Sequence, residues 1–155
     1  MKIGIIVHSH TGNTLSVANK LKDELIKKKY DVNVEQVIAV NEEPSAVTNI
    51  ELKNIPEINT YDMLIFAAPV RGLSLSPVMK AYLLQIPSLQ GKKVKCFVTQ
   101  FFPFEWMGGK QSINQMKNLC KSKGVDVFET GIVNWSSKKR EKKIECIIKN
   151  FCNWN

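Results

Sequence analysis

The chain has 155 residues, of which 44% are hydrophobic and 23% are charged. These proportions are ordinary for a globular protein and exclude a disordered chain, and the length favours a single domain spanning residues 1–155. The net charge of +8 would attract anionic partners. However, the basic residues are spread along the chain without zinc-ligand spacing, an RNA-stacking motif or basic-region heptads, so we expect no nucleic-acid partner.

The first half of the chain alternates strand and helix patterns. Residues 3–7 form a continuously apolar run, which is typical of a strand covered on both faces. Apolar residues recur three or four positions apart over residues 15–25 and predict an amphipathic helix. Residues 32–38 carry apolar residues at even spacings and predict a more exposed edge strand. Residues 39–61 are polar and interrupted by prolines, and predict a loop in which a short helix near residues 45–48 is an option.

The second half continues the same alternation. Short apolar runs rich in β-branched and aromatic residues predict strands over residues 63–68, 94–99 and 125–133. Between and after them, apolar residues at helical spacing predict helices over residues 77–86, 113–120 and 144–151. Typical terminal residues accompany these helices, namely Pro77 in a first turn, Gly124 after a last turn and Ser137 as an N-cap.

This alternation predicts an α/β fold with one five-stranded parallel sheet and helices on both faces. The strand order 2-1-3-4-5 is consistent with it. In such sheets, ligands bind outside the carboxyl ends of the strands, where the strand order reverses. The predicted site is therefore built from residues 8–14, 69–76 and 100–109, which we call the first, second and third loops.

The first loop leaves a buried strand and opens a helix, a position that favours an anion. Unpaired N–H groups and the helix dipole attract a phosphate at a helix N-terminus. Gly12 would let the backbone approach closely, Asn13 adds an amide, and His10 could donate to a phosphate or be a plain loop residue. The loop also carries three hydroxyl donors, Ser9, Thr11 and Thr14. The glycine-lysine pattern of P-loops is absent.

The Ser-x-Thr-Gly-Asn-Thr pattern of residues 9–14, placed after the first strand, resembles the FMN-phosphate loop of the flavodoxin-like family. The resemblance extends over essentially the whole chain, with residues 39–61 the vaguest part. It implies a three-layer flavodoxin-like sandwich that binds FMN noncovalently. The implied phosphate contacts are Ser9, His10, Thr11, Gly12, Asn13 and Thr14. The alternative interpretation of this segment is a polar turn followed by a helix cap.

The second loop begins with Pro69-Val70-Arg71-Gly72. This segment resembles flavodoxin-like NAD(P)H:quinone oxidoreductases, in which the corresponding Pro-x-Arg segment lies at the edge of the isoalloxazine ring. Flavodoxins proper often place a stacking tryptophan in this loop, which has none here. Arg71 could equally be a surface charge that pairs with a phosphate or carboxylate elsewhere, and Gly72 a simple turn glycine.

The third loop contains four aromatic residues within six positions, 101–106. Such a cluster would promote aggregation if exposed, so we expect it to cover a flavin ring, a dimer partner or the domain's own core. Gly108 and Gly109, which open the next helix, again resemble the quinone oxidoreductases. The cofactor contacts implied for this loop are Thr99, Gln100, Phe101, Phe102, Gly108 and Gly109.

The resemblance implies an FMN redox protein in which the flavin carries the chemistry, with no catalytic side chain and no metal. An enzyme would take electrons from NAD(P)H and reduce a quinone or similar acceptor, whereas a carrier would dock only to a redox partner protein. Carrier flavodoxins are typically acidic, so the basic charge of this chain favours the enzyme, although no nicotinamide-site motif can be identified. A flavodoxin fold that binds a phosphate ligand or a partner without redox chemistry is a third alternative, and the oligomeric state stays open.

The cellular location is inferred from the cysteines and from the apolar segments. The four cysteines, at positions 96, 120, 146 and 152, include no C-x-x-C pair, and three fall at apolar positions, so we expect reduced thiols in the core. No signal-peptide pattern precedes the first strand, and no apolar stretch is long enough to span a bilayer. We therefore expect a cytoplasmic protein without a membrane partner.

Overall fold

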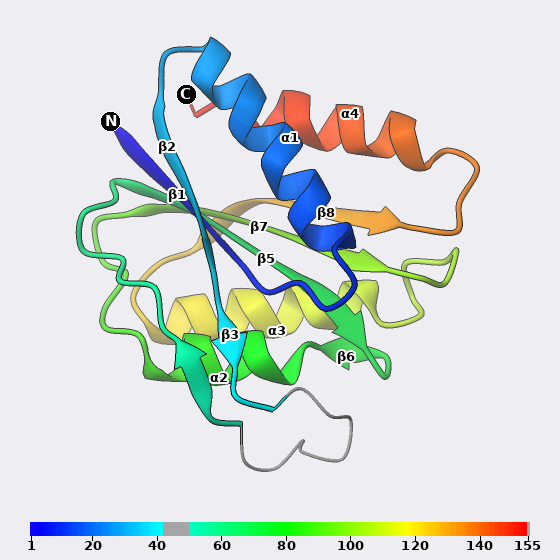
Figure 1. The fold of residues 1–155 in the computed structure, drawn as a ribbon, viewed down its shortest axis with the longest axis horizontal. Helices are drawn as coiled ribbons and strands as arrows, with labels where there is room; N and C mark the ends of the chain where they lie inside the picture. The colour runs from blue at the N-terminus through cyan, green and yellow to red at the C-terminus, as the bar shows by residue number, and fades with distance from the viewer. Residues whose placement is uncertain (42–49, 155) are drawn as a thin grey trace.

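The computed structural model, which describes residues 1–41 and 50–154, has a central sheet between two layers of helices (Figure 1). The strands are β1 (Lys2–Val7), β2 (Asp31–Gln36), β3 (Ile38–Ala39), β4 (Leu52–Asn54), β5 (Met63–Arg71), β6 (Ser74–Leu75), β7 (Lys93–Gln100) and β8 (Val127–Asn134). The helices are α1 (Asn13–Lys27), α2 (Pro77–Gln85), α3 (Gly109–Ser122) and α4 (Arg140–Phe151).

The main sheet confirms the predicted parallel α/β architecture. Its order is β2-β1-β5-β7-β8, with every neighbouring pair parallel, so the five strands follow the order 2-1-3-4-5 in chain sequence. One addition was not predicted, because β6 pairs antiparallel with β5 and extends the sheet to six strands. The edge position of β2 explains its largely exposed pattern, in which Val32 alone is buried.

The connection between β2 and β5 departs from the predicted alternation of strand and helix. The expected edge strand stops at Gln36, and Ile38 instead pairs with Asn54 in a separate antiparallel ribbon of β3 and β4. Between the two sheets, Val37 is 1% exposed, and its N–H still donates to the carbonyl oxygen of Val7 at 2.8 Å. The short helix considered near residues 45–48 lies outside the described residues.

The hydrophobic core has two halves, one on each face of the sheet. Alternate residues of β5 illustrate the division, since Leu64 and Phe66 face α2 and α3 whereas Met63 and Ile65 face α1 and α4 (Figure 1). All four side chains are 0–1% exposed. Burial on both faces explains why these strands are continuously apolar in the sequence.

Two of the three predicted helix ends are confirmed. Pro77 occupies the first turn of α2, and the side chain of Ser76 caps that helix by accepting a hydrogen bond from the N–H of Met79 at 3.3 Å. Gly124 follows α3 with a φ of +96°. The prediction for Ser137 was wrong, because its Oγ accepts from the N–H of Lys139 in the turn before α4 and does not cap the helix itself.

Lys95 is buried at the amino end of the sheet, away from the predicted site. Its Nζ donates to the carbonyl oxygens of Asn150, Phe151 and Asn153 at 3.2, 3.2 and 2.5 Å, and lies 4.1 Å from the centre of the Trp154 ring. The ammonium group therefore satisfies the last carbonyls of α4, where the helix dipole also favours a cation. Burial lowers the pKa of Lys95 to about 8, so the group is still mainly charged at neutral pH.

The cysteines are free thiols, three of them in the core. Cys96, Cys120 and Cys152 are buried, whereas Cys146 is exposed on α4. Burial raises the pKa of the Cys96 thiol well above its ordinary value, so this thiol stays protonated. None of the helices in the described part of the chain is long and apolar enough to span a bilayer.

Candidate functional site

The three predicted loops leave the sheet at one edge. β1, β5 and β7 are neighbours, and their carboxyl ends are aligned because Val7 pairs with Ala67 and Pro69 pairs with Thr99. The first loop follows β1, the second begins within the last residues of β5, and the third begins at the last residue of β7 (Figure 1). Sheet topology therefore brings together residues that lie up to about one hundred positions apart in the chain.

The first loop presents the N-terminus of α1. Gly12 adopts a left-handed conformation with a φ of +94°, and the Oγ of Ser9 accepts hydrogen bonds from the N–H groups of Gly12 and Leu15 at 3.2 and 3.3 Å. Within residues 1–41 and 50–154, the backbone N–H groups of Thr11, Asn13 and Thr14 donate no hydrogen bond. The first turn of α1 carries no acidic residue, so this end of the helix suits an anion.

Thr14 connects the first loop to the end of β7. Its Oγ1 lies 2.7 Å from the Oγ1 of Thr99, and both residues are buried, at 1% and 4% exposure. One hydroxyl proton is used in this bond. The other hydroxyl proton can be donated elsewhere, because each hydroxyl is both a donor and an acceptor.

His8, the first residue of the first loop, connects that loop to the second, although it was not among the predicted cofactor contacts. Its Nδ1 lies 2.6 Å from the Oγ of Ser76, and both side chains are buried. The Oγ of Ser76 accepts from the N–H of Met79, so its own proton is available for Nδ1. A histidine directly after a buried strand, within a predicted site loop, was the signal that could have identified it.

The second loop is a tight hairpin between β5 and β6. Its two turn residues, Gly72 and Leu73, have φ values of +56° and +65°, a combination that matches the right-handed twist of the two strands. Gly72 thus has the role of a turn glycine. The hairpin is held against α3 because the Oε1 of Gln115 accepts from the Oγ of Ser74 and the N–H of Leu75 at 3.0 and 2.8 Å. Arg71 is half-buried and forms no ion pair with any described acidic residue.

The third loop is held by buried amide side chains beneath it. The Nε2 of Gln100 donates to the carbonyl oxygens of Phe102 and Phe104 at 2.7 and 2.6 Å. The Nδ2 of Asn134, which is next to Gln100 in the register of β7 and β8, donates to the same Phe102 oxygen at 3.2 Å. With the carbonyls turned inward, the rings point out, and Phe101 and Phe102 are 71% and 46% exposed. The aromatic residues therefore do not belong to the domain's own core.

Gly108 is the point at which the second and third loops touch. It has a φ of +106°, and a Cβ built on it would lie 2.7 Å from the Cα of Leu73 and 2.7 Å from Cγ1 of Val70. Only glycine therefore allows this contact between the two backbones. As predicted, Gly108 and Gly109 open the next helix, since Gly108 is the N-cap and Gly109 the first residue of α3.

The predicted site residues thus lie on three adjoining loops, and most of the residues that hold these loops in place were missed. His8 joins the first loop to the second, and Gln115 of α3 holds the second loop. Asn134 and Ser136 hold the third loop, the latter by donating its Oγ proton to the carbonyl of Phe101 at 2.6 Å. Asn134 and Ser136 could have been found from the strand order alone, because β8 ends beside β7. In the described residues, no cluster of three or more His, Cys, Asp or Glu side chains could hold a metal ion.

The architecture is similar to that of several solved structures, although no family model and no curated protein matches the sequence. Oxidised flavodoxin 1 from Bacillus cereus is 17% identical with a TM-score of 0.71, and the match covers 97% of this chain and 94% of that one. Flavodoxin 2 from the same organism is 20% identical, with a TM-score of 0.67 and coverage of 98% and 95%. A flavodoxin from Fusobacterium nucleatum bound to flavin mononucleotide is 17% identical, with a TM-score of 0.63 and coverage of 97% and 96%. The chain therefore has the flavodoxin fold.

Proposed function

We propose that this chain binds FMN noncovalently at the three-loop site and passes electrons through it. The observation that carries the proposal is the meeting of two features at one sheet edge. One is the N-terminus of α1, with N–H groups that donate no hydrogen bond in the described structure and with hydroxyls nearby. The other is the third loop, which carries exposed aromatic rings and contacts the β5–β6 hairpin at Gly108. The first feature suits a terminal phosphate and the second a planar apolar ring. The F. nucleatum flavodoxin of the same fold is bound to FMN.

The residues fit this ligand in their donor chemistry. The N–H groups of Thr11, Asn13 and Thr14 and the hydroxyl of Thr11 would hold the phosphate, with Ser9 shaping the loop around it. The second and third loops would enclose the ring. The flavin supplies the redox chemistry when bound, whereas the side chains bind and orient it and shield it from water.

Titration of the apoprotein with FMN, riboflavin and FAD, followed by flavin absorbance and fluorescence, tests this proposal. FMN should bind far more tightly than riboflavin, which lacks the phosphate, and than FAD. Thr11→Ala should weaken FMN binding about tenfold to a hundredfold, because a hydrogen bond to a charged group contributes about 1.5–3 kcal/mol. Thr60→Ala, at an exposed position before β5, is the control. Equal affinities for FMN and riboflavin would contradict the assignment of the first loop.

A second candidate function is an enzyme that uses NAD(P)H to reduce a quinone or similar acceptor. The observation that favours it is the positive charge of Arg71 at the site edge without a carboxylate partner in the described structure, since NAD(P)H is an anion. NADPH oxidation that depends on FMN and on added quinone would support the enzyme. Rapid electron exchange with a redox protein without such turnover would support a carrier, and a protein that takes up no flavin would be left with a non-redox role.

The free cysteines suit a reducing compartment, so the cytoplasm is the proposed location.

A further inference from the structure

The third loop displays an aromatic patch, which we define as Phe101, Phe102, Phe104 and Trp106. These four side chains are 46–73% exposed. Phe104 and Trp106 are stacked with ring centres 5.9 Å apart and planes 7° apart, while Phe101 and Phe102 meet edge to face at 6.0 Å. Because Gln100 and Asn134 fix the backbone beneath them, the rings are held outward. So large an exposed apolar cluster is typical of an interaction surface.

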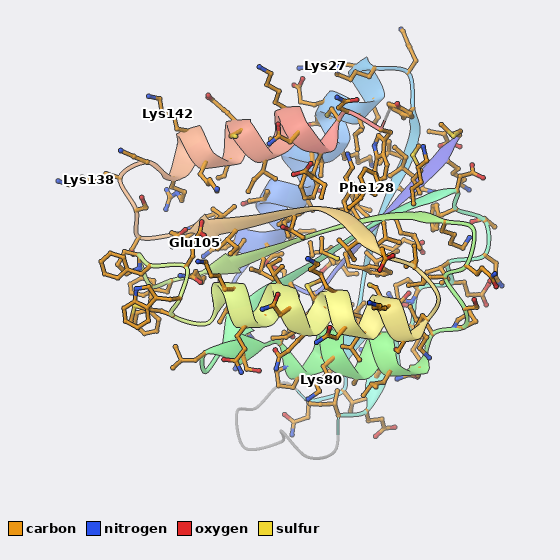
Figure 2. The ribbon with its side chains drawn as sticks, turned by 180° about the vertical axis from the view of Figure 1, so that it is seen from behind. Lys27, Lys80, Glu105, Phe128, Lys138 and Lys142 are labelled. Atoms are coloured by element: carbon orange, nitrogen blue, oxygen red, sulfur yellow. The ribbon has the colours of Figure 1, made fainter. Side chains whose placement is uncertain are left out.

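A set of lysines, which we call the basic rim, lies around this patch: Lys110, Lys138, Lys139, Lys142 and Lys143. All five are exposed. Lys110 directly follows the loop at the start of α3, and the Nζ of Lys143 on α4 lies 3.8 Å from the Oε1 of Glu105 in the loop. Figure 2 shows Lys138 and Lys142 at the same end of the molecule as Glu105.

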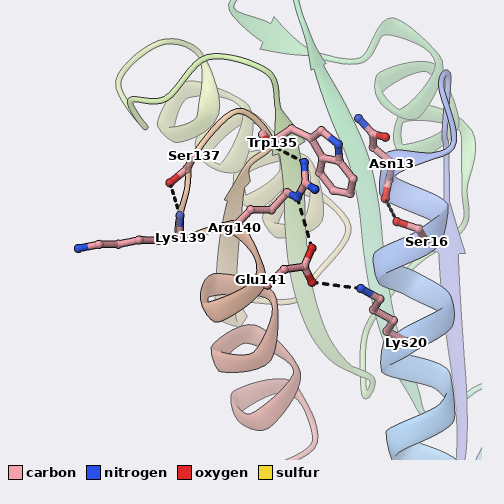
Figure 3. Close-up of polar contacts among 8 residues, drawn as sticks. All are labelled: Asn13, Ser16, Lys20, Trp135, Ser137, Lys139, Arg140 and Glu141. Carbon is pink, nitrogen blue, oxygen red and sulfur yellow. Dashed lines mark hydrogen bonds and ion pairs between the residues drawn. The ribbon is translucent and has the colours of Figure 1, made fainter.

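The positive charge of the basic rim is largely uncompensated. Apart from Lys143, its lysines form no ion pair within the described part of the chain. The nearby carboxylate of Glu141 is already engaged by Lys20 and Arg140, at 3.3 and 3.4 Å, and Lys139 points away from these groups (Figure 3). The face therefore combines an apolar centre with a surrounding excess of positive charge.

We propose that this face docks on the surface of an anionic phospholipid membrane. Phenylalanine and tryptophan side chains that protrude beside several lysines are typical of proteins bound at the membrane interface, and four to eight basic residues are the usual number for binding anionic lipid. A protein partner fits less well, because lysine is depleted in protein–protein interfaces. No membrane partner was expected from the sequence because no apolar stretch is long enough to span a bilayer, but surface binding requires no such segment.

This inference goes beyond the proposed function. It does not require bound flavin, but it requires that the four rings of the patch stay exposed when flavin is bound, with the flavin ring enclosed by the rest of the second and third loops. A docked molecule would hold the carboxyl edge of the sheet against the bilayer, with the patch inserted among the headgroups and the basic rim against the anionic charges. If the site does bind FMN, an acceptor dissolved in the lipid, such as a hydrophobic quinone, would then reach it without leaving the membrane.

The test is cosedimentation of the full-length protein, with and without FMN, with vesicles of pure phosphatidylcholine or of phosphatidylcholine and phosphatidylglycerol. We expect binding to the anionic vesicles that weakens in high salt. Lys138→Gln combined with Lys142→Gln should weaken it about 25-fold, because each lysine near the surface contributes about fivefold. Lys80→Gln with Lys117→Gln removes the same charge elsewhere on the surface and should have a much smaller effect.

The contribution of the aromatic patch is tested in the same assay. Phe104→Ser with Trp106→Ser should strongly reduce binding, whereas Leu84→Ser with Ile55→Ser, at other exposed apolar positions, should not. Failure to bind anionic vesicles at low salt, with or without FMN, would overturn the proposal and leave the face to a soluble acidic partner. Binding that the two serine substitutions in the patch do not change, or that FMN abolishes, would also overturn it. If the serine substitutions change nothing, charge alone attracts the protein to the vesicles. If FMN abolishes binding, the aromatic rings cover the flavin.

Discussion

The contact between the second and third loops can be tested by replacing Gly108 with alanine. Two costs are expected from the geometry. First, a φ of +106° is strained for any residue with a Cβ, at about 1–2 kcal/mol. Second, the added Cβ would lie 2.7 Å from the Cα and 2.9 Å from the carbonyl carbon of Leu73. Those are backbone atoms, so no side-chain rotation relieves the contact.

The second cost can be separated from the first with a matched control. Gly91 also has a positive φ, +84°, but a Cβ built on it would meet nothing within 4 Å. Gly91→Ala should therefore lower the free energy of unfolding by about 1–2 kcal/mol, from strain alone. Gly108→Ala should add an overpacking cost of about 1–3 kcal/mol. The total loss would be about 2–5 kcal/mol.

Urea unfolding of the wild type and both variants, followed by far-UV circular dichroism, measures these differences. Because the hairpin must move to accommodate the Cβ, Gly108→Ala should also weaken FMN binding if the proposed function holds, whereas Gly91→Ala should leave it unchanged. If the two variants are equally destabilised, the close approach of the two loops does not exist in solution, and that contact does not assemble the site.

Two further predictions concern charged groups. The pKa of Lys95 is about 8 in the folded protein, below its unfolded value of 10.5. Between pH 8 and 10.5 the folded state therefore binds fewer protons than the unfolded state, so the free energy of unfolding rises with pH through that window. Lys95→Met should lack this contribution, and identical pH profiles in urea unfolding would contradict the burial of its charge. Arg71→Gln should make the midpoint potential of bound FMN more negative by about 20 mV, equivalent to about 1 kcal/mol for a two-electron couple. Potentiometric titration measures this shift, with Lys80→Gln as the control, and an unchanged potential would mean that Arg71 does not act on the flavin.

Much of the fold could be predicted because the information is local. The strands β1, β5 and β7 are buried on both faces and therefore appear as continuous apolar runs, and α1 and α3 show apolar residues at helical spacing. The β3–β4 ribbon could not be predicted, because two- and three-residue strands are too short to show a periodicity. Ser137 was misassigned because a serine before a helix can cap either the helix or the turn that precedes it.

By itself, the sequence determined the main strands and helices and the position of the first loop, because a turn between a buried strand and an amphipathic helix can be recognised from neighbouring residues. Only the tertiary structure decided how the site is held together. The hydrogen bonds between His8 and Ser76 and between Thr14 and Thr99 join residues 68 and 85 positions apart. The outward display of the aromatic patch likewise depends on Asn134, a residue of another strand. Such partners are set by which strands become neighbours and by which polar groups must be paired once buried, and no local pattern contains that information.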